Sequence, residues 1–483
     1  MKSMNVFSFK VFGSPAFSAG SLFMYEKVDS LLDITGLIEA SGIKLKGVPL
    51  AQLIKAIAAG VLNGKRSVNA IYEDIQENGS AKYVGEELDS ASKRNLFRAI
   101  EKLGSSKGKK LFEAIVNAFQ EKTGFDFSQT NLDFSSSFFF GNKCKLAKLG
   151  YSKDHRPDKP QVKLGLVQCG EQLIPFQYEV DEGSLHDAKQ FPTIFKSIKD
   201  KLPAGSLIVF DKGPNSKENL ELVAEAGHYY LTAEKMTAKM QLKINTLSKH
   251  CMKKVDSDTK CLTEETQEGH RYYYYSKKLA KQQKQRRARK IRELLKPAEQ
   301  LRKKMQGKAF KRKKTKTKLH IAELEEERII TETSIQKRLI TKPLKQIRKE
   351  LKAKDSELDG WFVLTTNKNV SPKEALKRYR KKDSVEKLFC SLKQNCKLRP
   401  FNVRKDECVK GSVFISSLSA FVLGCFQWIN KPLRNRSHKS ILEIVKRLTL
   451  ALKLNRFGKI IEATALNAND FLKKIFPQLQ NPT

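Results

Sequence analysis

The stretch SLIVFDKGPNSKENLELVAEAGHYYLTAE, residues 206–234, reads as a strand, a helix and a second strand. Its two ends, SLIVF and HYYLTA, are short runs rich in apolar, β-branched and aromatic residues, which is typical of buried strands. Between them, SKENLELVAEAG has helical apolar spacing and ends at a glycine. This alternation predicts an α/β domain in which Asp211 directly follows the first of the two strands.

Three more strands and a helix are predicted upstream of this stretch. The strands are NLDFSSSFFFG (131–141), QVKLGLVQ (161–168) and LIPFQYEV (173–180), and the helix is DAKQFPTIFKSIKDKL (187–202). The order β-β-β-α-β-α-β predicts a mixed sheet with helices over residues 126–235.

The regions on either side read mostly as helices. In residues 1–125, short helices at 50–64, 67–79 and 87–104 predict either a helix-turn-helix DNA reader or a plain helical bundle. After a strand at 361–367, helices are expected at 379–393 and throughout 401–475. The apolar run 412–428 contains four serines and a glutamine, so we expect a buried helix there rather than a membrane span.

The charge of the chain favours a polyanionic partner. Its 483 residues include 92 Lys and Arg against 52 Asp and Glu, a net charge of +40, while the hydrophobic content is that of a folded protein. Residues 277–318 hold 20 basic residues and two glutamates. They predict one or two helices, divided at Pro297, that contact DNA phosphates through residues such as Arg286, Arg287 and Arg289. A solvated basic face is the alternative interpretation.

Cysteine usage and the N-terminus indicate a cytoplasmic protein. The eight cysteines form no CxxC pair, so neither a zinc module nor a disulfide framework is predicted. The start, MKSMNVFSFKVFG, has no apolar stretch of the kind found in signal peptides.

Two aspartates stand in or just after apolar strands. Asp133 lies inside NLDFSSSFFFG, and Asp211 ends SLIVFD. Charged residues at such positions are usually paired or bound to metal, and functional groups gather at the carboxyl ends of strands in α/β sheets. Each aspartate alone could equally cap a turn or helix, but two in one predicted sheet favour a site.

A third carboxylate lies in the basic helix YRKKDSVEKLFCSLK, residues 379–393. At about 100° per residue, four polar residues share one face, opposite an apolar face; they are Tyr379, Lys382, Glu386 and Lys393. A surface glutamate paired with lysines is the alternative. With Asp133 and Asp211, however, Glu386 completes an oxygen donor set suited to Mg²⁺ or Mn²⁺, and two such ions support phosphoryl transfer.

Taken in order, three segments resemble the motifs of DDE-type transposases of prokaryotic insertion sequences. The first is LDFSSSFFFG (132–141) with LGYSKDHRPDKPQVKLGLV (149–167), and the second is VFDKGPNSKENL (209–220). The third is the helix at 379–393 followed by LRPFNVR (398–404). The family pattern Y-x2-R-x3-E-x6-K is met at Tyr379, Glu386 and Lys393, whereas Lys382 replaces arginine and loses its bidentate fork.

This resemblance implies a ribonuclease-H-like core, interrupted by an insertion domain and flanked by mostly helical N- and C-terminal regions. The implied division is a DNA-binding or assembly region (1–125), the core (126–235 and 359–430), a basic insertion (236–358) and a helical C-terminal region (431–483). It also implies Asp133, Asp211 and Glu386 as catalytic residues and ligands of two Mg²⁺ or Mn²⁺ ions. Tyr379, Lys382 and Lys393 would bind DNA phosphates.

The implied activity is metal-dependent cleavage at the ends of an insertion sequence, followed by transfer of the 3′-OH into target DNA. The expected partner is double-stranded DNA, bound by a homodimer in the prokaryotic cytoplasm on the nucleoid, with no membrane partner. Two alternatives stay open: a catalytically silent DNA-binding protein derived from a transposase, and a metal-dependent nuclease that cuts without joining.

Several other polar or aromatic residues receive weaker predictions. Asp126 is an alternative to Asp133, although the D-F-S-S spacing favours Asp133. Asp154, His155 and Asp158 are expected to form a turn or touch DNA, without a catalytic role. Trp361 and the four tyrosines at 272–275 are expected to pack in a core, with DNA contact, including base stacking by Trp361, as the alternative.

Overall fold

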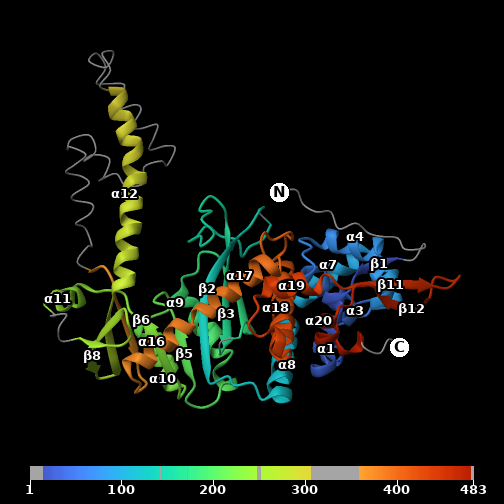
Figure 1. Ribbon diagram of the computed structural model, residues 1–483, viewed down its shortest axis with the longest axis horizontal. Helices are drawn as coiled ribbons and strands as arrows, with labels where there is room; N and C mark the ends of the chain where they lie inside the picture. Colours follow the sequence, from blue (N-terminus) through green and yellow to red (C-terminus); the bar gives the residue numbers. More distant parts are fainter. Residues whose placement is uncertain (1–14, 142, 171, 247–251, 306–357, 480–483) are drawn as a thin grey trace. The chain divides into compact units, whose positions relative to one another are not determined.

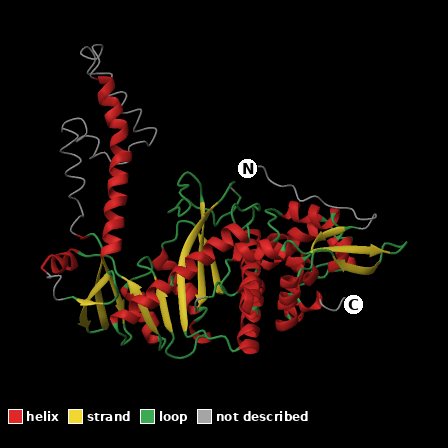
Figure 2. Ribbon diagram, viewed as in Figure 1, coloured by secondary structure: helices red, strands yellow, loops and turns green. Residues whose placement is uncertain are grey.

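The computed structural model describes residues 15–141, 143–170, 172–246, 252–305 and 358–479 (Figure 1). The chain forms two compact units, residues 1–232 with 377–483 and residues 233–376. Each unit contains helices and strands (Figure 2). The predicted mixed α/β class is therefore confirmed, while the five predicted segment boundaries stay a prediction.

The first unit contains a sheet with the strand order β4-β3-β2-β5-β6. Strands β2 (Gln129–Phe138), β3 (Gln161–Cys169) and β4 (Pro175–Glu182) pair antiparallel, and β5 (Leu207–Phe210) and β6 (Tyr229–Ala233) run parallel to β2. Helices α9 (Asp187–Lys196) and α10 (Lys217–Glu225) precede β5 and β6. This is the predicted order, and the pairing of Leu132 with Phe210 places Asp133 and Asp211 at the same level of neighbouring strands.

Helices cover the two opposite faces of this sheet. A Cβ atom at Gly165 of β3 would lie 3.0 Å from Ile194 of α9. Three residues further along β3, Gln168 accepts a hydrogen bond from Ser384 of α17 (Asp383–Cys390) at 2.6 Å. Side chains three positions apart on a strand lie on opposite faces, so α9 and α17 lie on different sides. All nine residues of β3 are buried.

The helices of the N-terminal region pack with α18 (Asp406–Ile429) in one hydrophobic core. They are α1 (Gly20–Leu32), α2 (Ile34–Ala40), α3 (Leu50–Leu62), α4 (Val68–Glu77), α5 (Ser80–Val84), α6 (Glu86–Asp89), α7 (Lys93–Leu103) and α8 (Ser106–Thr123). By length and composition α18 could cross a membrane, but 78% of its apolar window is buried inside the unit. The predicted buried helix at 412–428 is therefore confirmed.

The C-terminal region contains a β-hairpin where the sequence analysis predicts helix. Strands β11 (Thr449–Leu454) and β12 (Ile460–Ala465) pair antiparallel, and β1 (Ala16–Ser18) joins them at β11. The helical prediction was wrong here because TLALKL alternates buried and more exposed side chains, which suits a strand. Gly458 in the connecting turn has φ +75°, a conformation that ends regular structure. The helices α19 (His438–Val445) and α20 (Asp470–Ile475) flank the hairpin.

The predicted continuous helix at 379–393 is divided into three parts. Helix α16 (Pro372–Lys381) ends before Lys382, α17 follows, and a π-helical segment (Ser391–Asn395) ends the run. The break lies at Lys382. Just beyond it, the hydroxyl of Ser384 donates to Gln168 of β3, and Oγ of Ser384 also lies 2.7 Å from the carbonyl oxygen of Lys381. The angular spacing of an uninterrupted helix therefore does not apply between Tyr379 and Lys393.

The second unit contains antiparallel strands in the order β10-β9-β8-β7. These are β7 (Lys253–Lys254), β8 (Thr259–Thr266), β9 (Gly269–Ser276) and β10 (Trp361–Thr366), with helix α11 (Ala238–Thr246). Trp361 packs in a core with Met240 and Tyr273, and the tyrosines at 272–274 are buried, which fits the packing interpretation. Helix α12 (Lys277–Met305) is continuous through Pro297, so the predicted division there is absent. Residues 306–318 of the basic segment lie outside the described residues.

Candidate functional site

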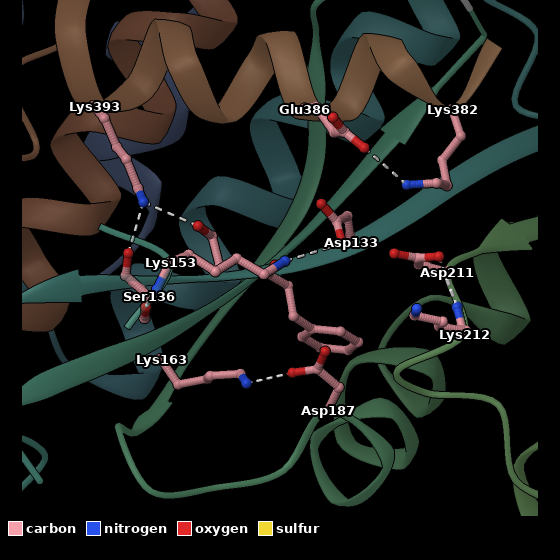
Figure 3. A network of polar contacts seen from close by, with 12 residues as sticks. Asp133, Ser136, Lys153, Lys163, Asp187, Asp211, Lys212, Lys382, Glu386 and Lys393 are labelled. Atoms are coloured by element: carbon pink, nitrogen blue, oxygen red, sulfur yellow. Dashed lines mark hydrogen bonds and ion pairs between the residues drawn. The ribbon is translucent and has the colours of Figure 1, made fainter. Parts of the chain in front are cut away.

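Three predicted carboxylates of the first unit face one lysine side chain. Asp133 comes from β2, Asp211 directly follows β5, and Glu386 lies on α17. Figure 3 shows the three side chains around the ammonium group of Lys382. Nζ of Lys382 lies 3.2 Å from Oε1 of Glu386. The predicted acidic residues, distant in sequence, are therefore brought to one place by the sheet register and by α17.

Lys382 is the central cation of this cluster. The residue is only 5% exposed. Burial tends to lower the pKa of its ammonium group, but the negative charges of Asp133, Asp211 and Glu386 outweigh burial, so the pKa is raised. Lys382 therefore stays protonated and compensates the charge of the carboxylates.

Asp133 is the most buried of the three carboxylates, with 8% of the residue exposed. Burial raises the pKa of Asp133, although Lys153 and Lys382 act in the opposite direction. Nζ of Lys153 lies 3.6 Å from Oδ1 of Asp133 and also donates to the carbonyl oxygen of Phe134. A carboxylate in this position depends on neighbouring cations to stay ionised.

Asp211 has the opposite balance. Burial would raise the pKa of Asp211, but the charge of Lys382, the backbone N–H of Lys212 and the hydroxyl of Tyr379 together lower it. Tyr379 donates to Oδ1 of Asp211 at 3.1 Å. Burial and Asp211 in turn raise the pKa of Tyr379, so the phenol keeps its proton and acts as a donor. Of the two aspartates, Asp211 therefore ionises more readily than Asp133.

Lys393 belongs to a second, adjacent group of ionic contacts. Its ammonium donates to Oγ of Ser135 at 2.9 Å, to the carbonyl of Ser136 at 2.6 Å and to Oδ1 of Asp154 at 3.0 Å. Arg399 donates to the same Asp154 oxygen at 2.7 Å. Burial lowers the pKa of Lys393 even though Asp154 partly opposes this. The structure therefore ties Lys393 to β2 and to Asp154, beside the carboxylate cluster.

One loop supplies partners to both groups. In the segment between β2 and β3, Lys153 reaches Asp133, while its neighbour Asp154 binds Lys393 and Arg399. The Asp154 side chain is only 5% exposed, and its Oδ2 atom has no hydrogen-bond partner in the described structure. The sequence predicts a turn or a DNA contact for Asp154, and no signal within the loop indicates a buried ion pair.

A buried polar network fixes α17 against the sheet. Nδ2 of Asn131 on β2 lies 3.0 Å from Oε1 of Gln168 on β3, and the hydroxyl of Ser384 donates to the same Gln168 oxygen at 2.6 Å. All three residues are buried. Sequence reasoning missed them, although amides in apolar strands and a serine on an apolar helix face are a usable signal. The network sets the position of α17, and therefore of Glu386.

The segment after Asp211 is also shaped by a close contact. A Cβ atom at Gly213 would lie 2.4 Å from Oδ2 of Asp187, the first residue of α9. Asp187 in turn forms an ion pair with the buried Lys163 of β3 (Figure 3). A larger residue at Gly213 would therefore displace the carboxylate of Asp187 from its present position.

Other predicted residues lie outside this cluster. Asp126 is exposed, and its carboxylate accepts hydrogen bonds from the backbone and hydroxyl of Ser128, which supports the choice of Asp133. Asp158 pairs with its neighbour Arg156. His155 has φ +56°, as expected in a turn.

The predicted DNA contacts of the second unit lie on α12 and differ in environment. Arg286 is exposed, and Arg289 forms an exposed pair with Glu293 at 2.9 Å. Arg287 forms an ion pair with Asp359, and both side chains are largely buried. Arg287 is therefore fixed by a largely buried ion pair, whereas Arg286 and Arg289 lie at the surface.

A divalent metal ion such as Mg²⁺ requires several oxygen donors around one position. Within the described ranges, no three His, Cys, Asp or Glu side chains are arranged so that they could hold a metal ion directly. Nevertheless, Asp133, Asp211 and Glu386 interact with one shared cation, Lys382. Carboxylate oxygens are among the donors that Mg²⁺ and Mn²⁺ prefer. The residues therefore fit such an ion chemically, provided that Lys382 gives way to it.

One comparison with known proteins matches the region of the chain that contains the three motifs. A family model described as a transposase DDE domain matches residues 130–421, more than half of the 483-residue chain. No curated protein matches. Among solved structures, the chain is similar to the cryo-EM structure of a piggyBac transposase synaptic complex with hairpin DNA. The TM-score is 0.41 at 8% identity, covering 89% of this chain and 78% of that chain.

Proposed function

The chain belongs to the transposase DDE domain family, and we propose that it cleaves the ends of an insertion sequence and joins them to target DNA. The observation that carries the proposal is the convergence of Asp133, Asp211 and Glu386 on Lys382. Proteins of this family generally use divalent metal ions. The order β-β-β-α-β-α-β also supports a ribonuclease-H-like core.

The three carboxylates would hold two Mg²⁺ or Mn²⁺ ions. Bound there, the ions would supply activation of water and of the 3′-OH and stabilisation of the leaving oxygen. The chain's own residues bind and orient the DNA. Tyr379 keeps its proton and can donate to a phosphate, and Lys382 and Lys393 provide positive charge beside the carboxylates.

The substrate is double-stranded DNA that carries the two ends of the element, engaged by a homodimer. The net charge of +40 supports a DNA partner. Inverted repeats in the genomic DNA around the reading frame would supply the sequence of the ends and hence the substrate for the assay.

The test is incubation of the purified protein with such DNA and Mg²⁺ or Mn²⁺, followed by analysis of cleaved and joined products. Wild type is expected to give both products. Asp211→Asn and Glu386→Ala are expected to give neither, while Asp158→Asn, at an exposed aspartate of the same unit, is expected to act as wild type. If Asp211→Asn and Glu386→Ala cut normally, the site assignment is wrong.

The same assay separates the two alternatives. Free ends without joined products would indicate a nuclease that cuts only. DNA binding without any cleavage by wild type, with both ions supplied, would indicate a silent DNA-binding descendant.

A further inference from the structure

A basic groove of about 910 Å³ opens in the first unit beside α17. Asp383, Lys387 and Cys390 of α17 line it, whereas Glu386 of the same helix takes part in the carboxylate cluster. The other walls are the end of α16, residues 172–173, the π-helical segment, the end of α18, the loop that follows it and the start of α19. The groove is thus a separate feature on a neighbouring face of the helix that carries Glu386.

The lining of the groove is strongly one-sided in charge. One carboxylate, Asp383, lines it, and this residue pairs with Lys387 at 2.7 Å. Six cationic side chains line it: Arg380, Lys381, Lys387, Arg434, Arg436 and Lys439. Positive charge concentrated in a concave surface attracts a polyanion more strongly than the same charges spread over a convex one.

The loop that carries two of the arginines is held in place. Gln427 is itself a lining residue, and its Nε2 donates to the carbonyl of Arg436 at 2.7 Å and lies 3.2 Å from the carbonyl oxygens of both Leu433 and Arg434. The next residue, Ser437, caps α19 by accepting from the backbone of Ser440. The arginine side chains are therefore presented from an ordered backbone, which lowers the entropic cost of binding.

Two further features of the groove favour an anion. The start of α19 is a lining element, and a helix N-terminus carries partial positive charge. Arg434 and Arg436 are exposed, and neither forms an ion pair with an acidic side chain among the residues that the structure describes. Their charges are therefore not compensated by the protein.

The aromatic content of the groove distinguishes duplex from single-stranded nucleic acid. Proteins that bind single strands without sequence preference stack bases on exposed aromatic side chains. One tryptophan, Trp428, lines the groove. Its ring packs edge-on against the rings of Phe119 and Phe125, with centroids 5.6 Å and 5.9 Å away. The groove therefore offers charge for phosphates rather than a stacking platform for bases.

We propose that this groove binds the phosphate backbone of duplex DNA independently of base sequence. It would hold DNA that extends beyond the phosphodiester at the carboxylates. Only the identity of the polyanion rests on the proposed function, since the charge and the shape of the groove are independent of the chemistry at Asp133, Asp211 and Glu386.

The test compares wild type with the triple variant Arg434→Gln, Arg436→Gln and Lys439→Gln. The binding of a random-sequence DNA duplex of about 30 base pairs, roughly three helical turns, is measured by fluorescence anisotropy over a series of salt concentrations. Each phosphate that the protein no longer neutralises reduces the slope of log K against log salt by about 0.9. We expect the triple variant to lower the slope by about one to three, and Arg434→Lys, Arg436→Lys and Lys439→Arg together to restore it.

A matched control removes three charges elsewhere in the same unit. Lys189, Lys196 and Lys217 are exposed on α9 and α10 and do not line the groove, and their change to Gln is expected to affect the slope less. Equal slopes in wild type and the groove variant, with unchanged thermal unfolding, would overturn the proposal. A weakening confined to single-stranded DNA would overturn the choice of duplex. Because binding is measured without cleavage, the result stands even if the protein proves catalytically silent.

Discussion

Lys393 and Asp154 form a buried ion pair, with Nζ 3.0 Å from Oδ1 and side-chain exposures of 10% and 5%. The two residues come from distant parts of the chain, 239 positions apart. Arg399 shares the same carboxylate oxygen. Asp154 therefore determines where two cations lie beside the carboxylate cluster, although it does not itself face Asp211 or Glu386.

Replacement of Asp154 by Asn should reduce DNA cleavage through Lys393. The change keeps the size of the side chain but leaves a buried ammonium without its anion, which costs about 3 kcal/mol of stability. Lys393 would then keep only its contacts to Ser135 and Ser136 on β2, without an anion to fix its position. A double-mutant cycle measures the coupling: Asp154→Asn should lower cleavage strongly in wild type and little further in a Lys393→Met background. Additive effects on cleavage would show that Asp154 acts independently of Lys393.

Replacement of Lys382 by Met should strengthen metal binding. In the structure its ammonium interacts with all three carboxylates, so a divalent ion has to displace it. Removal of one unit charge at about 4 Å is worth about 1–4 kcal/mol, and we expect Mn²⁺ to bind about tenfold more tightly or better. The measurement is calorimetric titration with Mn²⁺ alone. Lys212→Met removes an exposed lysine next to Asp211 and serves as control. Equal affinities in all three proteins would contradict a competing role for Lys382.

The local pattern of apolar residues was sufficient to predict the strands of the sheet in the first unit. The strands β2 to β6 and the helices α9 and α10 were predicted because their apolar periodicity agrees with their burial. The division of the helix at 379–393 was not predictable in this way. Ser384 bonds to Gln168 and lies close to Asn131, which are 216 and 253 positions away. A helix distorted by such distant partners leaves no periodic signal in its own sequence.

In the candidate site, too, residues marked by their local sequence were predicted, and those that depend on distant partners were not. Asp133 and Asp211 were singled out because a charge in an apolar strand is costly, and the family resemblance added Glu386. The central place of Lys382 was not predicted, since an uninterrupted helix puts it on a shared face but says nothing about its burial. Asp154 was placed in a polar turn for the same reason: its partners Lys393 and Arg399 adjoin it only after folding.

On α12, neighbouring arginines should respond differently to substitution. Arg287→Gln breaks a largely buried ion pair with Asp359 and should destabilise the second unit by about 1–2 kcal/mol. Arg286→Gln, at an exposed position, should leave stability unchanged and weaken binding of random-sequence DNA. The chain has two tryptophans, and Trp361 lies in the second unit, so its fluorescence in a Trp428→Phe background follows unfolding of that unit. Equal DNA affinity of wild type and Arg286→Gln would argue that this part of α12 faces solvent.

The stability of the first unit should fall in mild acid because of His438. This residue is buried, its Nδ1 lies 2.8 Å from the hydroxyl of Ser391, and burial lowers its pKa from 6.5 to about 4. Because the folded pKa lies below the unfolded one, the unfolded chain binds the proton first as pH falls. The contribution of neutral His438 is thus fully present above about pH 6.5 and is lost progressively toward pH 4. Between pH 7 and 5 the loss is about 2 kcal/mol.

The contribution of His438 to the pH dependence of stability can be measured with one tryptophan as the reporter and one substitution at His438. In a Trp361→Phe background, Trp428 reports on urea unfolding of the first unit at pH 7 and pH 5. His438→Asn keeps a polar partner for Ser391 but cannot titrate in this range, so its stability should change about 2 kcal/mol less between the two pH values than wild type. His186→Asn, at an exposed position, provides the matched control and should behave as wild type. If His438→Asn loses as much stability as wild type on acidification, other groups cause the acid sensitivity.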